Sequence, residues 1–341
     1  MTTIDLDRRR NASTDAPVVA VLGIGERAVF ALGDGSLHTF ASEGDWRSPP
    51  VHRGAILSAV VADRGRVLSG GEDGRVVATD QEGRCEEIFG SSGRWVESVA
   101  ADPQSGRMAW VCGREVHVRG PGNWQASTRS TSTPSALAFD ARGRRLGFTY
   151  YGGVTLWLEE PKGSKFRELE WKGSHISLTW SPDNSYVVTG MQENALHVWE
   201  LAATAKRAGS DAGNGHLHMR GYPAKTRSFS WSSDGRWLAT SGAESVVVWP
   251  FDKGGPAKRR PKELGAMPAK VATVAFHPSG SCIAAGYTDG TVLVLGMKGG
   301  EETLVRRADG HAVTAATWFS GGDRLAVGTR HGDVVIADYR S

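Results

Sequence analysis

The most constraining feature of the sequence is a module that recurs along its whole length. Each copy has an apolar strand, a turn rich in Ser, Pro, Asp and Gly, a second strand ending in small residues, a short turn and a third strand. The mean step is ~42 residues, within the ~40–45 of a four-stranded propeller blade. One continuous repeat through all 341 residues predicts a single closed β-propeller over residues 1–341, instead of the two domains that length alone suggests. Eight copies are found, with first strands near Val19, Ile56, Val96, Ala136, Ile176, Ser228, Ala272 and Val313.

The first turn of the module is its clearest part. An aromatic residue precedes a tight reversal, as in Trp180-Ser-Pro-Asp-Asn184 and Phe276-His-Pro-Ser-Gly280. Pro fixes φ, and Asp, Asn or Gly accepts the turn geometry, while the aromatic side chain can be buried between blades. The second turn contains Gly, as in the segment from Leu68 to Val76, so each module is expected to form two hairpins.

In this pattern the chain resembles the WD-repeat family, whose repeats carry Gly-His before the first strand and Trp-Asp at the end of the third. The matching positions are Gly310-His311 for the first pair and Trp157, Trp199 and Trp249 for the second, where Leu158, Glu200 and Pro250 replace Asp. The resemblance implies an all-β ring of four-stranded antiparallel blades. Because the signature is degenerate, no blade is expected to retain clearly the family's buried His–Ser/Thr–Asp–Trp hydrogen-bond network.

The number of blades and the closure of the ring follow from counting strands. Eight strand triplets favour eight blades; seven is the alternative, with the weak third module, around residues 111–116, as the one that is not a blade. A ring loses its free sheet edges only if a strand from the other terminus completes the last blade. The alternating segment at residues 3–7 is predicted to be that strand; the alternative is a disordered charged leader. Residues 202–215, rich in Gly, Ala and Ser, are predicted to form an exposed insertion loop.

Charge, cysteine content and hydropathy exclude several classes of protein. The net charge of +3, from 40 basic and 37 acidic residues, does not favour nucleic-acid or membrane binding. The three cysteines have no paired spacing, which argues against a disulfide framework. No apolar run resembles a signal peptide or a membrane span, so we expect a cytoplasmic protein, and the Ala, Gly and Arg bias suggests a bacterial source.

The sequence contains no arrangement that predicts catalysis. We find no nucleophile beside a base and no phosphate-binding loop, so we predict no enzyme activity, no catalytic residues and no cofactor. His216-Leu-His218 is the one local pair that could hold a metal, because alternate residues of a strand point the same way. A metal site needs three or four ligands and no further ligand is near in sequence, so no metal site is predicted.

The resemblance also implies where a partner binds. In the family, the loops into the first strands and the turns between second and third strands share one face around the central channel. Trp, Tyr and Arg are the types enriched at interface hot spots. Carried over by pattern, the predicted partner-binding face contains Arg94, Trp95, Arg114, Tyr150, Tyr151, His175, Met191, Arg227, His311, Arg330 and His331.

We therefore predict a monomeric, non-catalytic scaffold that binds another protein, whose identity the sequence leaves open. The alternative is a propeller that binds a small molecule or responds to a metal through its central channel, as an accessory protein of metal homeostasis would.

Overall fold

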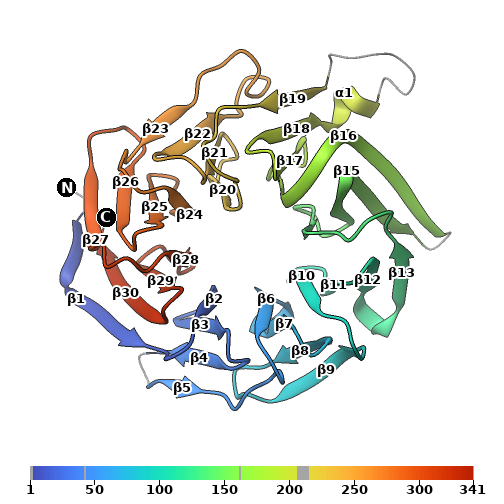
Figure 1. Ribbon diagram of the computed structural model, residues 1–341, viewed down its shortest axis with the longest axis horizontal. Helices are drawn as coiled ribbons and strands as arrows, with labels where there is room; N and C mark the ends of the chain where they lie inside the picture. Colours follow the sequence, from blue (N-terminus) through green and yellow to red (C-terminus); the bar gives the residue numbers. More distant parts are fainter. Residues whose placement is uncertain (1–2, 42–43, 161–162, 206–214, 341) are drawn as a thin grey trace.

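The chain forms a closed ring of antiparallel β-sheets around a central axis (Figure 1). The computed structural model describes residues 3–41, 44–160, 163–205 and 215–340. The described strands form seven sheets, six with four strands and one with six. Counted as hydrogen-bonded sheets, the propeller therefore has seven blades.

The first three blades each contain four strands, hydrogen-bonded in sequence order. Their strands are β2 (Val18–Ile24), β3 (Arg27–Leu32), β4 (Leu37–Phe40) and β5 (Trp46–Arg47); β6 (Ile56–Val61), β7 (Val67–Gly71), β8 (Arg75–Thr79) and β9 (Cys85–Gly90); and β10 (Val96–Asp102), β11 (Arg107–Cys112), β12 (Glu115–Arg119) and β13 (Gln125–Arg129). Single 3₁₀ turns at Asp63–Gly65 and Pro121–Asn123 lie between strands.

The next blade is the six-stranded sheet, which we call the shared sheet. Its strands are β14 (Leu137–Phe139), β15 (Arg145–Glu160), β16 (Gly163–Trp180), β17 (Tyr186–Met191), β18 (Leu196–Glu200) and β19 (His216–Met219). The first part of β16 pairs with β15, and its last part, from His175 onward, pairs with β17. The fourth and fifth modules are thus joined by one continuous strand.

This continuity corrects the predicted blade number. Eight separate blades were favoured, but residues 172–174 stay extended and carry β16 from one module into the next. The third module, expected to be the missing blade, instead forms the ordinary blade β10–β13. Local turn signals do not report whether a hydrogen-bonded ladder continues across a module boundary, and here it does.

Three further blades complete the ring. Two contain β20 (Phe229–Trp231), β21 (Trp237–Thr240), β22 (Val246–Pro250) and β23 (Lys262–Leu264), and β24 (Val271–Phe276), β25 (Cys282–Tyr287), β26 (Val292–Gly296) and β27 (Glu302–Arg306). The last contains β28 (Val313–Trp318), β29 (Arg324–Thr329), β30 (Asp333–Arg340) and the N-terminal β1 (Thr3–Ser13), in the order β1-β30-β29-β28. The only α-helix among the described residues is α1 (Leu201–Ala205).

The two ends of the chain meet in the last blade. β1 runs antiparallel to β30, with Ile4 opposite Tyr339 and Ala12 opposite Val334 and a register shift between Asp5 and Arg10. The strand is longer than the segment 3–7 predicted from sequence, and it includes the arginine run. The N- and C-termini consequently lie next to each other in Figure 1.

The predicted insertion loop at 202–215 is described only in part. Residues 202–205 lie in α1 and are helical, which corrects the prediction of a loop for this portion. Residues 206–214 lie outside the described residues.

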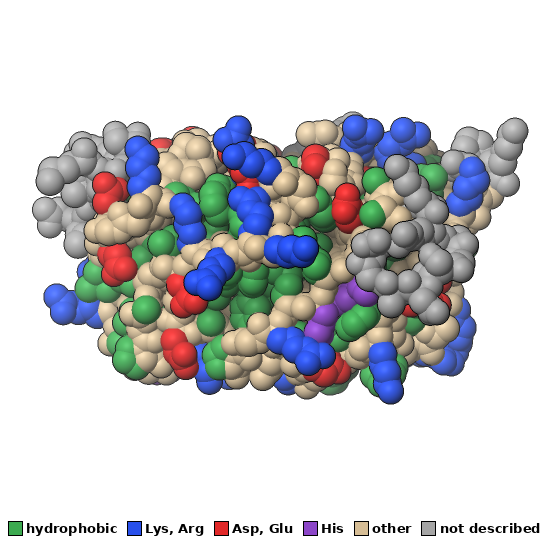
Figure 2. Space-filling model, turned by 90° about the horizontal axis from the view of Figure 1, so that it is seen from above, with side chains coloured by type: hydrophobic (Ala, Val, Ile, Leu, Met, Phe, Trp, Pro, Cys, Tyr) green, Lys and Arg blue, Asp and Glu red, His purple; other side chains and the backbone are tan. Residues whose placement is uncertain are grey.

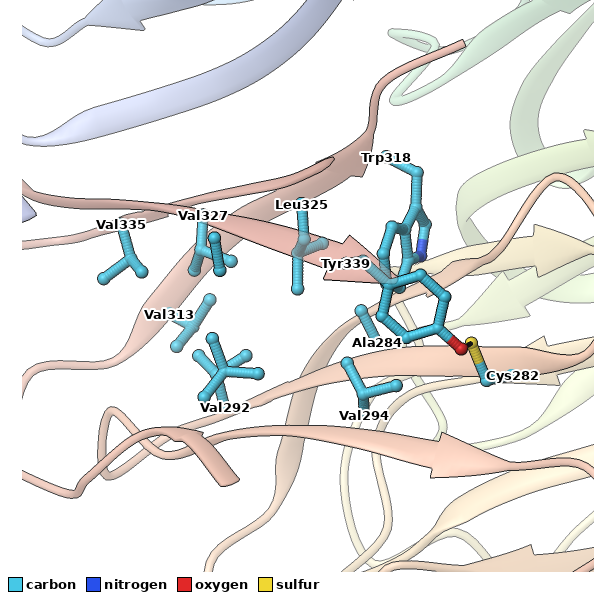
Figure 3. Close-up of a cluster of buried hydrophobic side chains, with 12 residues drawn as sticks. Cys282, Ala284, Val292, Val294, Val313, Trp318, Leu325, Val327, Val335 and Tyr339 are labelled. Carbon is cyan, nitrogen blue, oxygen red and sulfur yellow. Dashed lines mark hydrogen bonds between the residues drawn. The ribbon is translucent and has the colours of Figure 1, made fainter. Parts of the chain in front are cut away.

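The core lies between neighbouring blades. In the cluster of Figure 3, Val292 and Val294 of one blade pack against Trp318, Leu325 and other residues of the next. Trp318, the last residue of β28 and one position before the Phe319 that the turn pattern picks out, is buried and donates its indole N–H to the carbonyl oxygen of Ala275 at 3.0 Å. A tryptophan before the first turn therefore adds a directed hydrogen bond to the apolar contact between blades, whereas a phenylalanine such as Phe276 supplies only the apolar contact.

The seating of β1 in the ring is testable with two substitutions in the same strand. Ala12 packs against the buried cluster that contains Phe30 and Val334, whereas the neighbouring Asn11 is exposed. Ala12→Asp places a charge against this cluster and should lower the free energy of unfolding by ~2 kcal/mol. Asn11→Asp adds the same charge on the exposed side and should change it by less than ~0.5 kcal/mol. Urea denaturation measures both, and equal midpoints would show that β1 is not seated as described.

Candidate interaction face

One edge of the ring gathers two kinds of loop from every blade. Because neighbouring strands are antiparallel, the turns between second and third strands lie at the same edge as the connections into the next first strand. Backbone hydrogen bonds join the two kinds directly: Ser91 N–H donates to Gly74 O at 3.1 Å, and Ser130 N–H donates to Arg114 O at 2.9 Å. We call this edge the upper face.

Most of the predicted face residues lie in these loops or at the strand ends beside them. Tyr150, Tyr151 and His175 instead lie within the long strands β15 and β16, where the pairing register shifts near Tyr151 and His175. The predicted residues also differ in accessibility. Tyr150 and His311 are half-buried, and His175 and Met191 are buried. The exposed ones are Arg94, Trp95, Arg114, Tyr151, Arg227, Arg330 and His331.

His175 and Met191 therefore need correction, because their side chains are not available to a partner. The Nε2 of His175 lies 2.9 Å from the Trp171 carbonyl oxygen and its Nδ1 lies 2.8 Å from the Thr189 hydroxyl. Burial lowers the pKa of His175, so the ring stays neutral, donating through Nε2 and accepting at Nδ1. Met191 packs beneath Gly173, where a Cβ would lie 2.4 Å from the methionine methyl group. Both residues support the loop from below.

Part of the family's hydrogen-bond network is present in the β6–β9 blade, where the sequence analysis did not identify it. His52 lies with Nδ1 2.9 Å from the Asp73 carboxylate and with Nε2 2.8 Å from the Ser69 hydroxyl. Burial alone would raise the pKa of Asp73, but hydrogen bonds from Arg53 N–H and from His52 hold this pKa below its usual value. The position of the family's Trp is Thr79, and His52 follows Val51 instead of Gly, which hid the match.

The β20–β23 blade achieves a similar network with a different residue. The Tyr222 hydroxyl lies 2.8 Å from the Thr240 hydroxyl and accepts a hydrogen bond from the Trp249 indole N–H at 2.7 Å. A tyrosine thus stands in the connection into the blade, where the β6–β9 blade has His52. These buried networks hold the loops of the upper face against the strands beneath them.

Two aromatic side chains stand out on the upper face. Trp95 is 55% exposed and Tyr151 is 61% exposed. Trp95 lies in the connection into β10, and Tyr151 lies within β15 beside β14, whose blade neighbours that of β10. Arg94 extends over the β11–β12 turn at Gly113, and Arg114 follows in that turn. We call Arg94, Trp95, Arg114 and Tyr151 the Trp95–Tyr151 patch.

The charges of the upper face are unequally available. Several acidic side chains are held by backbone N–H groups: Glu72 accepts from Ala55 at 3.1 Å, Glu193 accepts from Ser174 at 3.1 Å, and Asp289 accepts from Thr291 at 2.9 Å. Within the described part of the chain, the side chains of Arg94, Arg227 and Arg330 form no ion pair. The face therefore presents free guanidinium groups, although the whole chain is nearly neutral.

Among the described residues, one group has its possible ligand atoms close enough together to hold a metal ion without rearrangement. It consists of Asp309, His311 and Asp333, whose ligand atoms lie within 4.8 Å of one another. Arg306 already neutralises it, pairing with Asp309 and lying 3.0 Å from an Asp333 oxygen. The Arg306 hydrogen bond is the main reason that the pKa of Asp309 falls to about 2. His331 stacks on His311 with ring centres 4.1 Å apart. The group is best described as an ion-pair network capped by two imidazoles.

Within the described ranges, no helix has the length and apolar character needed to cross a membrane.

Three segments match the family model described as WD domain, G-beta repeat: residues 165–200, 216–249 and 262–294. Each match begins in the outer strand of one module and ends in the third strand of the next, so the sequence repeat and the structural module are offset by one strand.

The chain is 26% identical over 165 residues to the WD repeat-containing protein SL1-17 of Schistosoma mansoni, covering 47% of this chain and 51% of that protein. It is 23% identical over 276 residues to Actin-interacting protein 1 of Drosophila melanogaster, covering 78% of this chain and 43% of that protein. A third match, at 24% identity, is to Protein hir1 of Schizosaccharomyces pombe and covers 36% of this chain and 14% of that protein. The chain thus spans about half or less of each of these relatives.

The network at His52 can be tested by changing only the serine hydroxyl. Ser69→Ala leaves the buried Nε2 of His52 without this partner and should lower the free energy of unfolding by ~1–3 kcal/mol. Ser69→Thr keeps a hydroxyl, as Thr189 does beside His175, and should recover most of the loss. Thermal and urea unfolding of the two variants check this, and equal losses would mean that packing, not the hydrogen bond, decides the effect.

Proposed function

We propose that this chain, a WD-repeat β-propeller, is a non-catalytic scaffold that binds another protein through its upper face. The observation that carries the proposal is the Trp95–Tyr151 patch, in which two neighbouring blades present two highly exposed aromatic side chains and two arginines. Aromatic residues and Arg dominate the binding energy of protein interfaces because they combine large apolar area with directed hydrogen bonds. Two of the five large hydrophobic side chains that are exposed among the described residues lie in this patch.

The charge distribution indicates what kind of partner surface fits. Free guanidinium groups favour carboxylates, which they bind through two parallel hydrogen bonds. Several acidic side chains of the upper face are already held by backbone N–H groups, and Asp309 is paired with Arg306, so these carboxylates compete little for the free arginines. We therefore expect a partner segment that places an apolar or aromatic side chain between acidic residues.

The rigidity of the face supports binding without rearrangement. The loops that carry the patch are joined to neighbouring turns by backbone hydrogen bonds, as at Ser91 and Ser130. A surface held in its binding conformation loses less conformational entropy when a partner docks. The name of one relative, Actin-interacting protein 1, states that this relative interacts with another protein; actin itself is not part of our proposal.

We also propose that the protein is a monomer that does not bind nucleic acid or membranes and has no enzyme activity. Its cytoplasmic location and bacterial source remain predictions. No specific observation favours the alternative function, in which a small molecule or metal binds in the central channel. It predicts a ligand-dependent rise in melting temperature that substitutions on the upper face leave unchanged.

The proposal is tested by comparing two pairs of aromatic substitutions. Trp95→Ala with Tyr151→Ala removes both anchors from the upper face. Trp46→Ala with Phe166→Ala removes two aromatic side chains that are 38% and 48% exposed and lie in β5 and β16, outside the upper face. Both variants should fold, because all four side chains are exposed. Immobilised wild-type chain and each variant are used to capture partners from an extract of the source cells.

We expect a protein that wild type and the Trp46/Phe166 variant retain and that the Trp95/Tyr151 variant loses by at least ~30-fold in affinity, since two hot-spot side chains each contribute ~1–2 kcal/mol or more. Equal retention by the Trp95/Tyr151 variant would contradict the upper face as the binding site. Circular dichroism of both variants serves as the folding control.

A further inference from the structure

A group of histidine and aromatic side chains lies in the shared sheet, away from the Trp95–Tyr151 patch. In the β18–β19 hairpin, His197 lies opposite His218 and Trp199 lies opposite His216. Side chains alternate along a strand and opposite residues share a face, so His197, His216 and His218 project from the same face of the hairpin. Histidine side chains reach the molecular surface on this outer side of the ring (Figure 2).

His197 lies at the centre of this group. Its ring centre is 5.2 Å from that of His216 and 5.9 Å from that of His218. It also stacks on Trp171, from the first part of β16, at 4.3 Å, and the same indole lies 5.3 Å from His216 and 5.2 Å from His218 between ring centres. The Trp171 carbonyl oxygen lies 2.9 Å from Nε2 of His175, which anchors the strand that carries the indole.

The hydrogen-bonding state of His197 is unusual for a buried side chain. The residue is fully buried, and neither ring nitrogen has a hydrogen-bond partner among the described residues. Nδ1 of His218 is buried and unpaired in the same way. A neutral imidazole has one donor and one acceptor nitrogen, and nearly all buried polar groups are paired. Stacking on Trp171 occupies the face of the ring and leaves both nitrogens unsatisfied.

We propose that His197, His216 and His218 bind one divalent transition-metal ion of the zinc type. When two imidazoles bind one tetrahedral ion at metal–nitrogen distances of ~2.0–2.1 Å, their ring centres lie ~5 Å apart. The ring centres of His216 and His218 lie at similar distances from that of His197, 5.2 Å and 5.9 Å. The ring nitrogens do not yet converge on a point, so binding requires the half-buried His216 and His218 to turn toward His197.

The chemistry of the ligand set selects the ion. Three imidazoles without a carboxylate or thiolate suit Zn²⁺, Ni²⁺ and Cu²⁺, whereas Mg²⁺ and Ca²⁺ require oxygen ligands. Burial is the main cause that lowers the pKa of His197 to about 2, and the neighbouring histidines lower it further. The ring is therefore neutral at physiological pH, which is the state that binds a metal.

The test uses the untagged full-length chain and Zn²⁺ in equilibrium dialysis, followed by metal analysis. We expect one ion per chain, and Co²⁺ in its place should give the visible absorption of a tetrahedral site. His216→Gln with His218→Gln should weaken zinc binding by at least ~10-fold. Zinc should also raise the melting temperature of the wild type, because it binds the folded chain.

The matched control removes two imidazoles from another site. His311→Gln with His331→Gln on the upper face should leave zinc binding unchanged. A third variant, His197→Phe, keeps a ring that can stack on Trp171. Its melting temperature, measured with a chelator present, should match that of the metal-free wild type and so show that the variant folds. The same variant should no longer bind zinc. The proposal is overturned if wild type binds no zinc, if the His216/His218 variant binds it equally, or if the His311/His331 variant loses it. Partner capture by the upper face is independent of all three outcomes.

Discussion

The structure depends on the pairing of β1 with β30, because a sheet edge carries unpaired N–H and carbonyl groups. Blades packed in a ring are stable only if the first and last of them are joined. Here the joining strands lie at opposite ends of the sequence, and Thr14 N–H continues the ladder to Gly332 O at 2.9 Å. Closure turns a row of modules, each in contact only with its neighbours, into one rigid body.

Rigidity of the ring is what allows short loops to act as a surface. Each sheet packs against its neighbours, and directed hydrogen bonds such as Trp318 Nε1 to Ala275 O, at 3.0 Å, fix one blade against the next. The turns of the upper face therefore need no core of their own. Side chains as distant in sequence as Trp95 and Tyr151 can be presented by neighbouring blades, and buried polar groups such as His52 and His175 hold the loops from beneath.

The shared sheet combines a structural irregularity with a chemical one. Because β16 runs through two modules, its first part carries Trp171 into contact with His197, which belongs to the following module. The same strand carries His175, whose contact with the Trp171 carbonyl oxygen fixes the chain between the two parts. A buried histidine with unpaired nitrogens is therefore held where two partly exposed histidines of β19 can reach it. The shared sheet thus carries Tyr151 of the Trp95–Tyr151 patch on β15 and this histidine group on the β18–β19 hairpin.

The sequence by itself determined the repeat, the positions of the hairpin turns and the aromatic residue buried between blades, because these depend on local periodicity and turn chemistry. A closing strand could also be predicted, since edge pairing demands one, although only a segment of β1 was found. Tertiary structure alone decided that two modules share a sheet, that His175 and Met191 are buried, and that His197 faces His218. These features depend on strand register and on the packing of one blade against the next. Both are set by contacts between residues far apart in the chain, and no local pattern records them.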